Sequence, residues 1–407
     1  MDSIKPIRIC IASSGLGHVQ RGIESWALEL GKALAQRDQH VYLCKGAGDV
    51  THDYERVIPC WTRDSLKTAR LLRWIPKSLG MRIGLGAGYG VEQVTFAWKL
   101  IWFLRHERID ILHLQDPQVA ILVQRAVQIG LLKTRTILNH GTDEPSEFLA
   151  KIEFLQHGAP WHQQSAIEAG IWKDSWTMIP NFVDTQKFKP GKCDRLRAQL
   201  EIPPDALVAL VSSAIKKKHK RIDFIVTEFE SVCKQYPQLP LWLVIAGGRA
   251  SDTEPLIHDA QERLGQRVRF VVDAPQSAMP DLYRMADILL HGSLKEMMPM
   301  ALLEATASGL PCLCHYHPVM EWMVGPGGVA LNLEVAGELA NAVCSLASDI
   351  GRRKTLSKAA RLHCISLFDR QTVVDQILAY YSMVHRYRRN SPAKAAGPNG
   401  LIGNFHC

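Results

Sequence analysis

Short apolar runs alternate along this chain with longer segments in which apolar residues recur every three or four positions. The first run covers residues 7–12, and the segment 19–36 that follows has the spacing of an amphipathic helix. The apolar side of this segment consists of Ile23, Trp26, Ala27, Leu30 and Leu34. Because strands that alternate with helices form βαβ units, the pattern predicts an α/β fold with parallel sheets.

The alternation is interrupted once, over residues 184–205, where the sequences KPGK (189–192) and PP (203–204) punctuate a short helical piece. The predicted strands before it are 7–12, 41–44, 109–114, 136–139 and 177–180, and those after it are 207–213, 241–246, 268–272, 288–291 and 311–315. Two doubly wound domains are therefore expected. Ligands of such sheets bind at the carboxyl ends of the strands, so the site is expected in a cleft between the domains.

These breaks divide the chain into five parts. We expect a first Rossmann-like domain over residues 1–185, a linker over 186–205 and a second Rossmann-like domain over 206–368. The segment 369–386 is predicted to be a last helix that packs back towards the first domain. The tail, residues 387–407, is basic at first and then rich in Gly, Pro and Asn, which is typical of disorder.

Composition narrows the ligand class without choosing one. A formal charge of +8 suits a nucleotide diphosphate, nucleic acid or an anionic membrane. Zinc-finger spacing and RNA-binding patterns do not occur, which argues against nucleic acid. The ten cysteines form no Cys-x-x-Cys, no signal-peptide pattern begins the sequence, and no apolar run reaches about 18 residues. These features predict a cytoplasmic protein with reduced thiols.

Residues 287–311 contain the most informative pattern of the sequence. A strand ends near His291, Pro299 suits the first turn of a helix, and Gly309 suits its end. Glu296 then precedes the helix and Glu304 lies inside it. The free N–H groups of the first helical residues, Met300 and Ala301, would attract phosphate. By spacing alone, solvated surface charges are the more common interpretation of such a pair of glutamates.

The segment 287–311 resembles the signature of glycosyltransferase family 4 (glycosyl transferases group 1), which comprises retaining enzymes of the GT-B fold. In that family two glutamates separated by seven residues occupy such a strand, loop and helix. Three further segments resemble the family in the same order: Gly15-Leu16-Gly17, 179–190 and 281–287. The ordered set is far more specific than any one of its members.

The resemblance implies roles for the residues of this segment. Glu304 would hold the ribose of a nucleotide, Glu296 would contact the donor sugar, and the amides of Met300 and Ala301 would bind the diphosphate. Pro299 stands where the family often has Gly, so any contact from an N–H at this position is lost.

A basic segment, residues 212–223, follows a predicted strand and would neutralise the charge that develops on a diphosphate leaving group. The family carries an Arg and a Lys here, four residues apart. Lys220 matches the Lys, but Ile215 stands in the place of the Arg. Lys216 or Lys217 is left as the substitute, and a solvated basic turn is the alternative interpretation.

In the first domain, the family's Gly-rich loop corresponds to Gly17 and its neighbours, and the resemblance implies that Gly17 lets the backbone approach the donor phosphate. His18 replaces the family's second Gly. His18 retains a backbone N–H for phosphate, although a turn-capping role is equally compatible with the sequence. His140 follows a strand end and resembles the family histidine that contacts the donor sugar near its anomeric centre. Asp143 and Glu144 either orient an acceptor or cap the next helix.

No Asp-x-Asp occurs in the chain, so we expect no metal and no cofactor apart from the sugar nucleotide as co-substrate. The segments 62–83 and 91–104 interleave Lys and Arg with Trp and Leu. Such a stretch either lies on an anionic membrane as a peripheral contact at its inner face, or is a core-facing helix with a solvated basic side.

Together these features predict a cytoplasmic GT-B enzyme of the EC 2.4 class, in which the first domain binds the acceptor and the second binds the donor. A UDP-sugar or GDP-mannose would donate its sugar to a hydroxyl of a glycan, glycolipid or small molecule, as in polysaccharide biosynthesis. The alternatives are a nucleotide-sugar epimerase of the same fold and a non-catalytic nucleotide-sugar binding protein.

Overall fold

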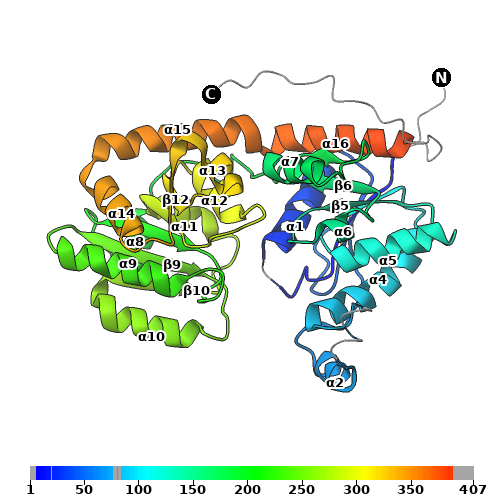
Figure 1. Ribbon diagram of the computed structural model, residues 1–407, viewed down its shortest axis with the longest axis horizontal. Helices are drawn as coiled ribbons and strands as arrows, with labels where there is room; N and C mark the ends of the chain where they lie inside the picture. Colours follow the sequence, from blue (N-terminus) through cyan, green and yellow to red (C-terminus); the bar gives the residue numbers. More distant parts are fainter. Residues whose placement is uncertain (1–5, 20, 77–79, 81–83, 388–407) are drawn as a thin grey trace.

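The computed structural model describes residues 6–19, 21–76, 80 and 84–387, in two lobes that lie side by side (Figure 1). Each lobe is built on one parallel sheet covered by helices. Almost all of the predicted tail, and residues 77–79 and 81–83 of the basic segment, lie outside the described residues.

The first lobe contains a seven-stranded sheet of order β3-β2-β1-β4-β5-β6-β7. Its strands are β1 (Ile9–Ser13), β2 (Val41–Lys45), β3 (Glu55–Val57), β4 (Ile111–Leu114), β5 (Arg135–Asn139), β6 (Phe154–His157) and β7 (Thr177–Met178). Its helices are α1 (Gly22–Ala35), α2 (Leu66–Trp74), α4 (Gly88–His106), α5 (Pro117–Gln128), α6 (Ser146–Leu149) and α7 (Pro160–Glu168). Strand β1 pairs with both β2 and β4, with Ile9 opposite Val41 and Ile111.

The second lobe contains a six-stranded sheet of order β10-β9-β8-β11-β12-β13. Its strands are β8 (Leu207–Ser212), β9 (Leu241–Gly247), β10 (Val268–Val272), β11 (Ile288–His291), β12 (Cys312–His315) and β13 (Gly328–Leu331). Its helices are α8 (Asp194–Gln199), α9 (Ile222–Gln235), α10 (Thr253–Leu264), α11 (Met279–Met285), α12 (Met300–Ala307), α13 (Pro318–Val324), α14 (Glu338–Ser348) and α15 (Ile350–Phe368).

The last helix, α16 (Arg370–Arg386), returns to the first lobe after the chain has completed the second. Its buried face is Val373, Val374, Ile377, Tyr380, Tyr381 and Val384, which join the core around Ile9 and Ile11. Burial of each such side chain is worth about 1.5–3 kcal/mol, so α16 is a structural part of the first lobe. The hydroxyl of Tyr381 also lies 2.8 Å from Nδ1 of His113 in β4.

Several elements differ from the sequence-based expectation. Strands β3, β6 and β13 were not predicted, because β3 has only three residues, β6 ends in Gln156 and His157, and β13 begins with Gly328. Helix α1 begins at Gly22, three residues later than expected. Helix α15 was missed because only Ala360, Cys364 and Phe368 are buried along its 19 residues.

The strand orders locate the crevices in which ligands of such sheets bind. Each sheet reverses its direction of winding beside its first strand, β1 in one lobe and β8 in the other. The loop after β1 and the loops after β8 and β11 therefore open at the carboxyl ends of the two sheets, where doubly wound folds bind ligands.

Candidate functional site

The N-termini of helices α1 and α12 meet across the space between the lobes. A Cβ atom built on Gly22 of α1 would lie 3.5 Å from Cγ of Met300 in α12. The first backbone hydrogen bond of α12 runs from the Leu302 N–H to the Pro299 carbonyl (3.1 Å). The amides of Met300 and Ala301 precede this bond and are left free. Two helix N-termini at one place make it attractive to an anion.

Glu304, in the second turn of α12, is buried. The Tyr283 hydroxyl donates to one carboxylate oxygen (2.8 Å), and Nε2 of Gln276 lies 3.3 Å from the other. Burial raises the pKa of Glu304 to about 7, although these hydrogen bonds and the charge of Lys187 oppose the rise. A carboxyl group in this state releases its proton readily when a ligand's hydroxyls donate to it.

Glu296, in the loop before α12, is nearly as buried, but its pKa is shifted in the opposite direction. Its carboxylate forms an ion pair with Nζ of Lys220 and lies 3.5 Å from Nε2 of His291 and 3.8 Å from Nδ1 of His219. Burial alone would raise its pKa, but His291 and the Lys220 charge outweigh burial and hold the pKa well below the usual range. Glu296 is therefore ionised at neutral pH.

The loop after β8, which carries Lys220, is held in an unusual backbone conformation. His219 and Arg221 have φ of +75° and +50°, in the left-handed region that residues with a Cβ seldom adopt. Such strain persists where the surroundings enforce it, which is common at binding sites. Here Arg221 donates to the Leu333 carbonyl (2.9 Å) and holds the loop in place.

The structure also places the neighbours of Lys220. Ile215, at the position of the family Arg, is completely buried in the core of the second lobe. Lys217 is exposed, and its backbone N–H donates to Asp252 (2.7 Å). Lys216 is half-buried and close enough to His219 to lower that residue's pKa, although burial is the larger cause.

Gly17 and His18 lie in the turn after β1. Gly17 has φ of +100°, and a Cβ there would come within 1.9 Å of the Ala47 carbonyl oxygen, so only Gly fits. The backbone N–H of His18 donates to the Gly15 carbonyl (3.2 Å). This N–H is thus engaged in the turn, which corrects the expectation that it is free for phosphate.

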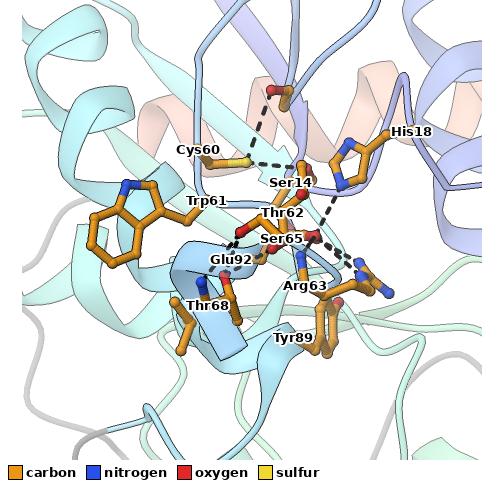
Figure 2. A network of polar contacts seen from close by, with 12 residues as sticks. Ser14, His18, Cys60, Trp61, Thr62, Arg63, Ser65, Thr68, Tyr89 and Glu92 are labelled. Carbon is orange, nitrogen blue, oxygen red and sulfur yellow. Dashed lines mark hydrogen bonds and ion pairs between the residues drawn. The ribbon is translucent and has the colours of Figure 1, made fainter. Parts of the chain in front are cut away.

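The side chain of His18 belongs to a buried polar network that the sequence pattern did not reveal (Figure 2). Nε2 of His18 lies 2.9 Å from Glu92, whose carboxylate also accepts from Nη2 (2.5 Å) and Nε (3.1 Å) of Arg63. Burial opposes ionisation of Glu92, but the bonds from Arg63 and His18 lower its pKa below the usual range. These charges are compensated before any ligand arrives.

A second ion pair and an aromatic ring extend this network towards α1. Arg21 donates to Glu24 (2.6 Å), and the Tyr89 hydroxyl donates to buried Asp116 (2.8 Å). The guanidinium groups of Arg21 and Arg63 lie 4.9 and 4.6 Å from the centre of the Tyr89 ring. Cations over an aromatic face are attracted to it, so the ring fixes both arginines at the edge of the first lobe.

His140 is buried at the end of β5, beside two other buried histidines. Its Nδ1 lies 3.1 Å from Nδ1 of His157, and its ring centre lies 5.3 Å from that of His162. Burial, and to a lesser degree His157, lowers the pKa of His140 to about 3. His140 is therefore neutral at physiological pH.

Asp143 and Glu144 do not cap α6, whose N-cap residue is Pro145. Asp143 instead forms an ion pair across the lobes with Lys295 (2.7 Å). A second contact joins the same loop to the first lobe, because the Asn181 N–H lies 3.1 Å from Sδ of Met298. The loop that carries Glu296 is thus held from both lobes.

The structure brings the predicted residues together from several elements. Lys220 and Glu296 are in contact. The segment that carries Glu296 continues into α12 with Met300, Ala301 and Glu304. Gly17 lies in the loop that leads into α1, and the first residue of α1, Gly22, lies beside Met300. His219, His291 and Tyr283 were missed, since only the fold places them beside the glutamates. In the part of the chain that the structure describes, no group of His, Cys, Asp and Glu residues could hold a metal ion. Nor is any helix there long and apolar enough to span a bilayer.

Comparisons with known proteins agree with this geometry. Residues 193–363 match the family model described as glycosyl transferases group 1. A D-inositol 3-phosphate glycosyltransferase of Stackebrandtia nassauensis is 28% identical over 54% of this chain and 52% of its own. An alpha-galactosylglucosyldiacylglycerol synthase of Streptococcus pneumoniae is 26% identical over 41% of this chain and 44% of its own. The chain spans about half the length of the curated relatives it matches.

Solved structures resemble the whole chain. Sucrose-phosphate synthase from Thermosynechococcus elongatus superimposes with a TM-score of 0.74 at 18% identity, over 93% of this chain and 99% of its own. HepE of Anabaena, solved in complex with UDP and glucose, gives 0.70 at 17% identity, over 92% and 99% of the two chains. The expected GT-B fold is therefore confirmed.

Proposed function

We propose that this chain, whose residues 193–363 belong to the glycosyl transferases group 1 family, transfers a sugar from a nucleotide diphosphate sugar to an acceptor hydroxyl with retention of anomeric configuration. The observation that carries the proposal is the arrangement around the N-terminus of α12. Free amides of Met300 and Ala301 lie between an ionised carboxylate, Glu296, and a buried carboxyl group, Glu304.

The donor would bind across the N-terminus of α12, between Glu296 and Glu304. The amides at the start of α12 and the ammonium group of Lys220 would hold the diphosphate, and Glu304 would accept hydrogen bonds from the ribose. Once Lys220 turns to phosphate, Glu296 becomes free to accept from hydroxyls of the sugar. We assign the place of the missing family Arg to Lys216, because it is half-buried and near His219, whereas Lys217 is exposed.

The bond that breaks joins the anomeric carbon to the diphosphate, and negative charge then develops on the leaving group. Lys220, Lys216 and the N-terminus of α12 would stabilise that charge. The family mechanism, in which the departing phosphate accepts the proton of the attacking hydroxyl, is part of this proposal. His140 is neutral, so its role would be a hydrogen bond near the anomeric centre rather than acid catalysis.

The first lobe would receive the acceptor, a glycan, a glycolipid or a small molecule. HepE was solved with UDP and glucose, and two relatives are named D-inositol 3-phosphate glycosyltransferase and alpha-galactosylglucosyldiacylglycerol synthase, which supports a sugar nucleotide as donor. A UDP-sugar or GDP-mannose is the donor we propose, with no metal. The lobe boundaries at 185 and 206 and a cytoplasmic location belong to the same proposal.

The proposal is tested with a panel of nucleotide sugars and their free diphosphates. Ligand binding raises the melting temperature, so the preferred nucleotide should stand out in a thermal-shift screen. The preferred donor is then incubated with candidate acceptors. A protein that is stabilised by no nucleotide, or that converts the donor without an acceptor into another sugar nucleotide, would overturn the proposal.

A further inference from the structure

The outer face of the first lobe, formed by α2, α4 and α5, contains an apolar groove that the proposed reaction does not use. The groove lies between α4, α5 and the loop before α2, and has a volume of about 570 Å³. Its apolar walls include Trp61, Trp98, Ile101, Trp102, Leu122 and Ile129. Its size suits a hydrocarbon chain or another slender apolar group.

Large apolar side chains are exposed around this groove. Trp98 and Trp102 of α4 are 69% and 55% exposed, and Ile129 is 79% exposed. Leu66 and Trp74 of α2, the helix that contacts α4, are also exposed. Contiguous exposed apolar surface of this kind marks an interaction site, since a protein in water gains nothing from it.

The exposed Lys, Arg, Asp and Glu side chains of the three helices are all cationic. Helices α2, α4 and α5 carry six Lys and Arg residues, all exposed: Lys67, Arg70, Arg73, Lys99, Arg105 and Arg125. The only carboxylate in these three helices is Glu92, which is buried in the network with Arg63 and His18. Exposed cations among tryptophans match the interface of an anionic bilayer, where Trp lies at the headgroup level.

The groove and the polar network share one wall. In Figure 2 the Trp61 side chain points away from Arg63, which reaches into the network. The backbone N–H of Trp61 donates to the Thr95 hydroxyl of α4 (3.0 Å), and the Arg63 guanidinium binds Glu92. Trp61 therefore lines the groove on one side of this loop, while Arg63, two residues later, faces the network on the other.

We propose that the face formed by α2, α4 and α5 docks on an anionic lipid bilayer, with a lipid hydrocarbon chain in the groove between α4 and α5. A further consequence, that the acceptor is a membrane amphiphile, rests on the proposed function. A second copy of this chain is a poorer occupant, because pairing two such faces would oppose six cations with six cations.

Flotation of the full-length protein with vesicles tests the docking directly. Wild-type protein should float with vesicles of phosphatidylglycerol and phosphatidylcholine in equal parts, and much less with phosphatidylcholine alone. The variant Trp98→Ser/Trp102→Ser should lose at least about tenfold in vesicle affinity, because two exposed anchors are removed without opening a core. Its control is Ile350→Ser/Leu362→Ser, which removes two exposed apolar side chains of α15 and should float like wild type.

Charge reversal tests the electrostatic part. Lys99→Glu/Arg125→Glu should weaken binding to anionic vesicles by about tenfold or more, since each cation near such a surface contributes about fivefold. Lys354→Glu/Lys358→Glu, on exposed positions of α15, makes the same change of charge elsewhere and should leave flotation intact. A loss equal to that of Lys99→Glu/Arg125→Glu would show that net charge alone acts, and would overturn the assignment of this face.

Two other results would also overturn the inference. One is wild-type protein that remains at the bottom with anionic vesicles. The other is a wild-type dimer in analytical ultracentrifugation that Trp98→Ser/Trp102→Ser converts to a monomer, because the groove would then bind a second copy. Flotation needs no donor, and all four variants should keep the nucleotide-induced thermal shift, so failure of the docking and failure of the proposed function give different results.

Discussion

The loop that holds Glu296 and the helix that holds Glu304 are adjacent in sequence, but they keep their carboxyl groups in opposite states. Glu296 pairs with Lys220, and its pKa lies below the usual range. Glu304 meets only neutral donors, Tyr283 and Gln276, and burial raises its pKa to about 7. Similar burial therefore does not imply the same charge, because the hydrogen-bonding and ion-pair partners decide the charge state.

The difference suits two kinds of ligand contact. A carboxylate that is already charged and paired can exchange its lysine for hydroxyls of a sugar as the lysine turns to phosphate. A carboxyl group that is held by neutral donors is stabilised further in its ionised form when a ligand supplies more donors. We therefore expect Glu296 to act in transfer and Glu304 in nucleotide binding.

The largest expected effect is on transfer. Glu296→Ala should slow release of nucleoside diphosphate from the preferred donor by about 100- to 1000-fold, as for loss of one group that stabilises a transition state. The affinity for free nucleotide should stay within about threefold of wild type. Glu262→Ala, an exposed position on α10, serves as the control and should keep wild-type rates. An active Glu296→Ala would remove the distinction between the two glutamates.

Stability without ligand should change in opposite directions at the two positions. The pKa of Glu304 is raised from 4.5 to about 7, so its ionisation costs nothing below pH 4.5 and increasingly destabilises the fold as pH rises towards 7. At about 1.4 kcal/mol per pKa unit, Glu304→Gln should stabilise the protein by on the order of 3 kcal/mol at pH 8. Thermal melts between pH 5 and 8 should show this gain shrinking as pH falls.

Glu296→Gln should instead destabilise the protein at pH 8, because it leaves Lys220 without its partner. Because the pKa of Glu296 is lowered, its contribution to the stability of the fold is complete above pH 4.5 and is lost only as the pH falls below that value. Melting temperatures that move in the same direction for Glu296→Gln and Glu304→Gln would contradict the contrast between the two sites.

Nucleotide affinity provides the next test. Glu304→Ala should weaken the binding of free nucleoside diphosphate by about 10- to 100-fold, which corresponds to the loss of hydrogen bonds to a charged group. Calorimetric titration at pH 8 measures this, and Glu304→Gln should retain part of the affinity. Unchanged affinity of Glu304→Ala would assign the ribose to another residue.

The smallest effect concerns the two lysines that could replace the family Arg. Lys216→Ala should lower the rate of nucleoside diphosphate release by about tenfold, through one cation fewer near the leaving group. Lys217→Ala, exposed and one residue away, is the matched control and should stay within about twofold. If Lys217→Ala slowed the release more than Lys216→Ala, the place of the family Arg would be assigned to Lys217.

The sequence predicted the elements that repeat the βαβ pattern, and it located Glu296 before α12 and Glu304 inside it. It missed β6, because Gln156 and His157 are buried polar residues that break an apolar run. It also attributed Gly17 to phosphate approach, whereas the structure gives a second reason, the contact with the Ala47 carbonyl.

The partners of the site residues were beyond the reach of sequence pattern. Glu92 and Arg63 are 29 positions apart, and Lys220 and Glu296 are 76 apart. Side chains from such distant segments meet only after the sheet order is fixed. The charge state of each glutamate, which depends on those partners, therefore follows from the fold.

The central claim is tested most directly by one-dimensional proton NMR of the preferred donor, incubated with wild-type protein with and without candidate acceptors. The anomeric proton reports consumption of the donor and the configuration of the product together. The account predicts acceptor-dependent loss of the donor signal and a product with the donor's anomeric configuration. A donor that is never consumed, or a product of inverted configuration, would contradict it.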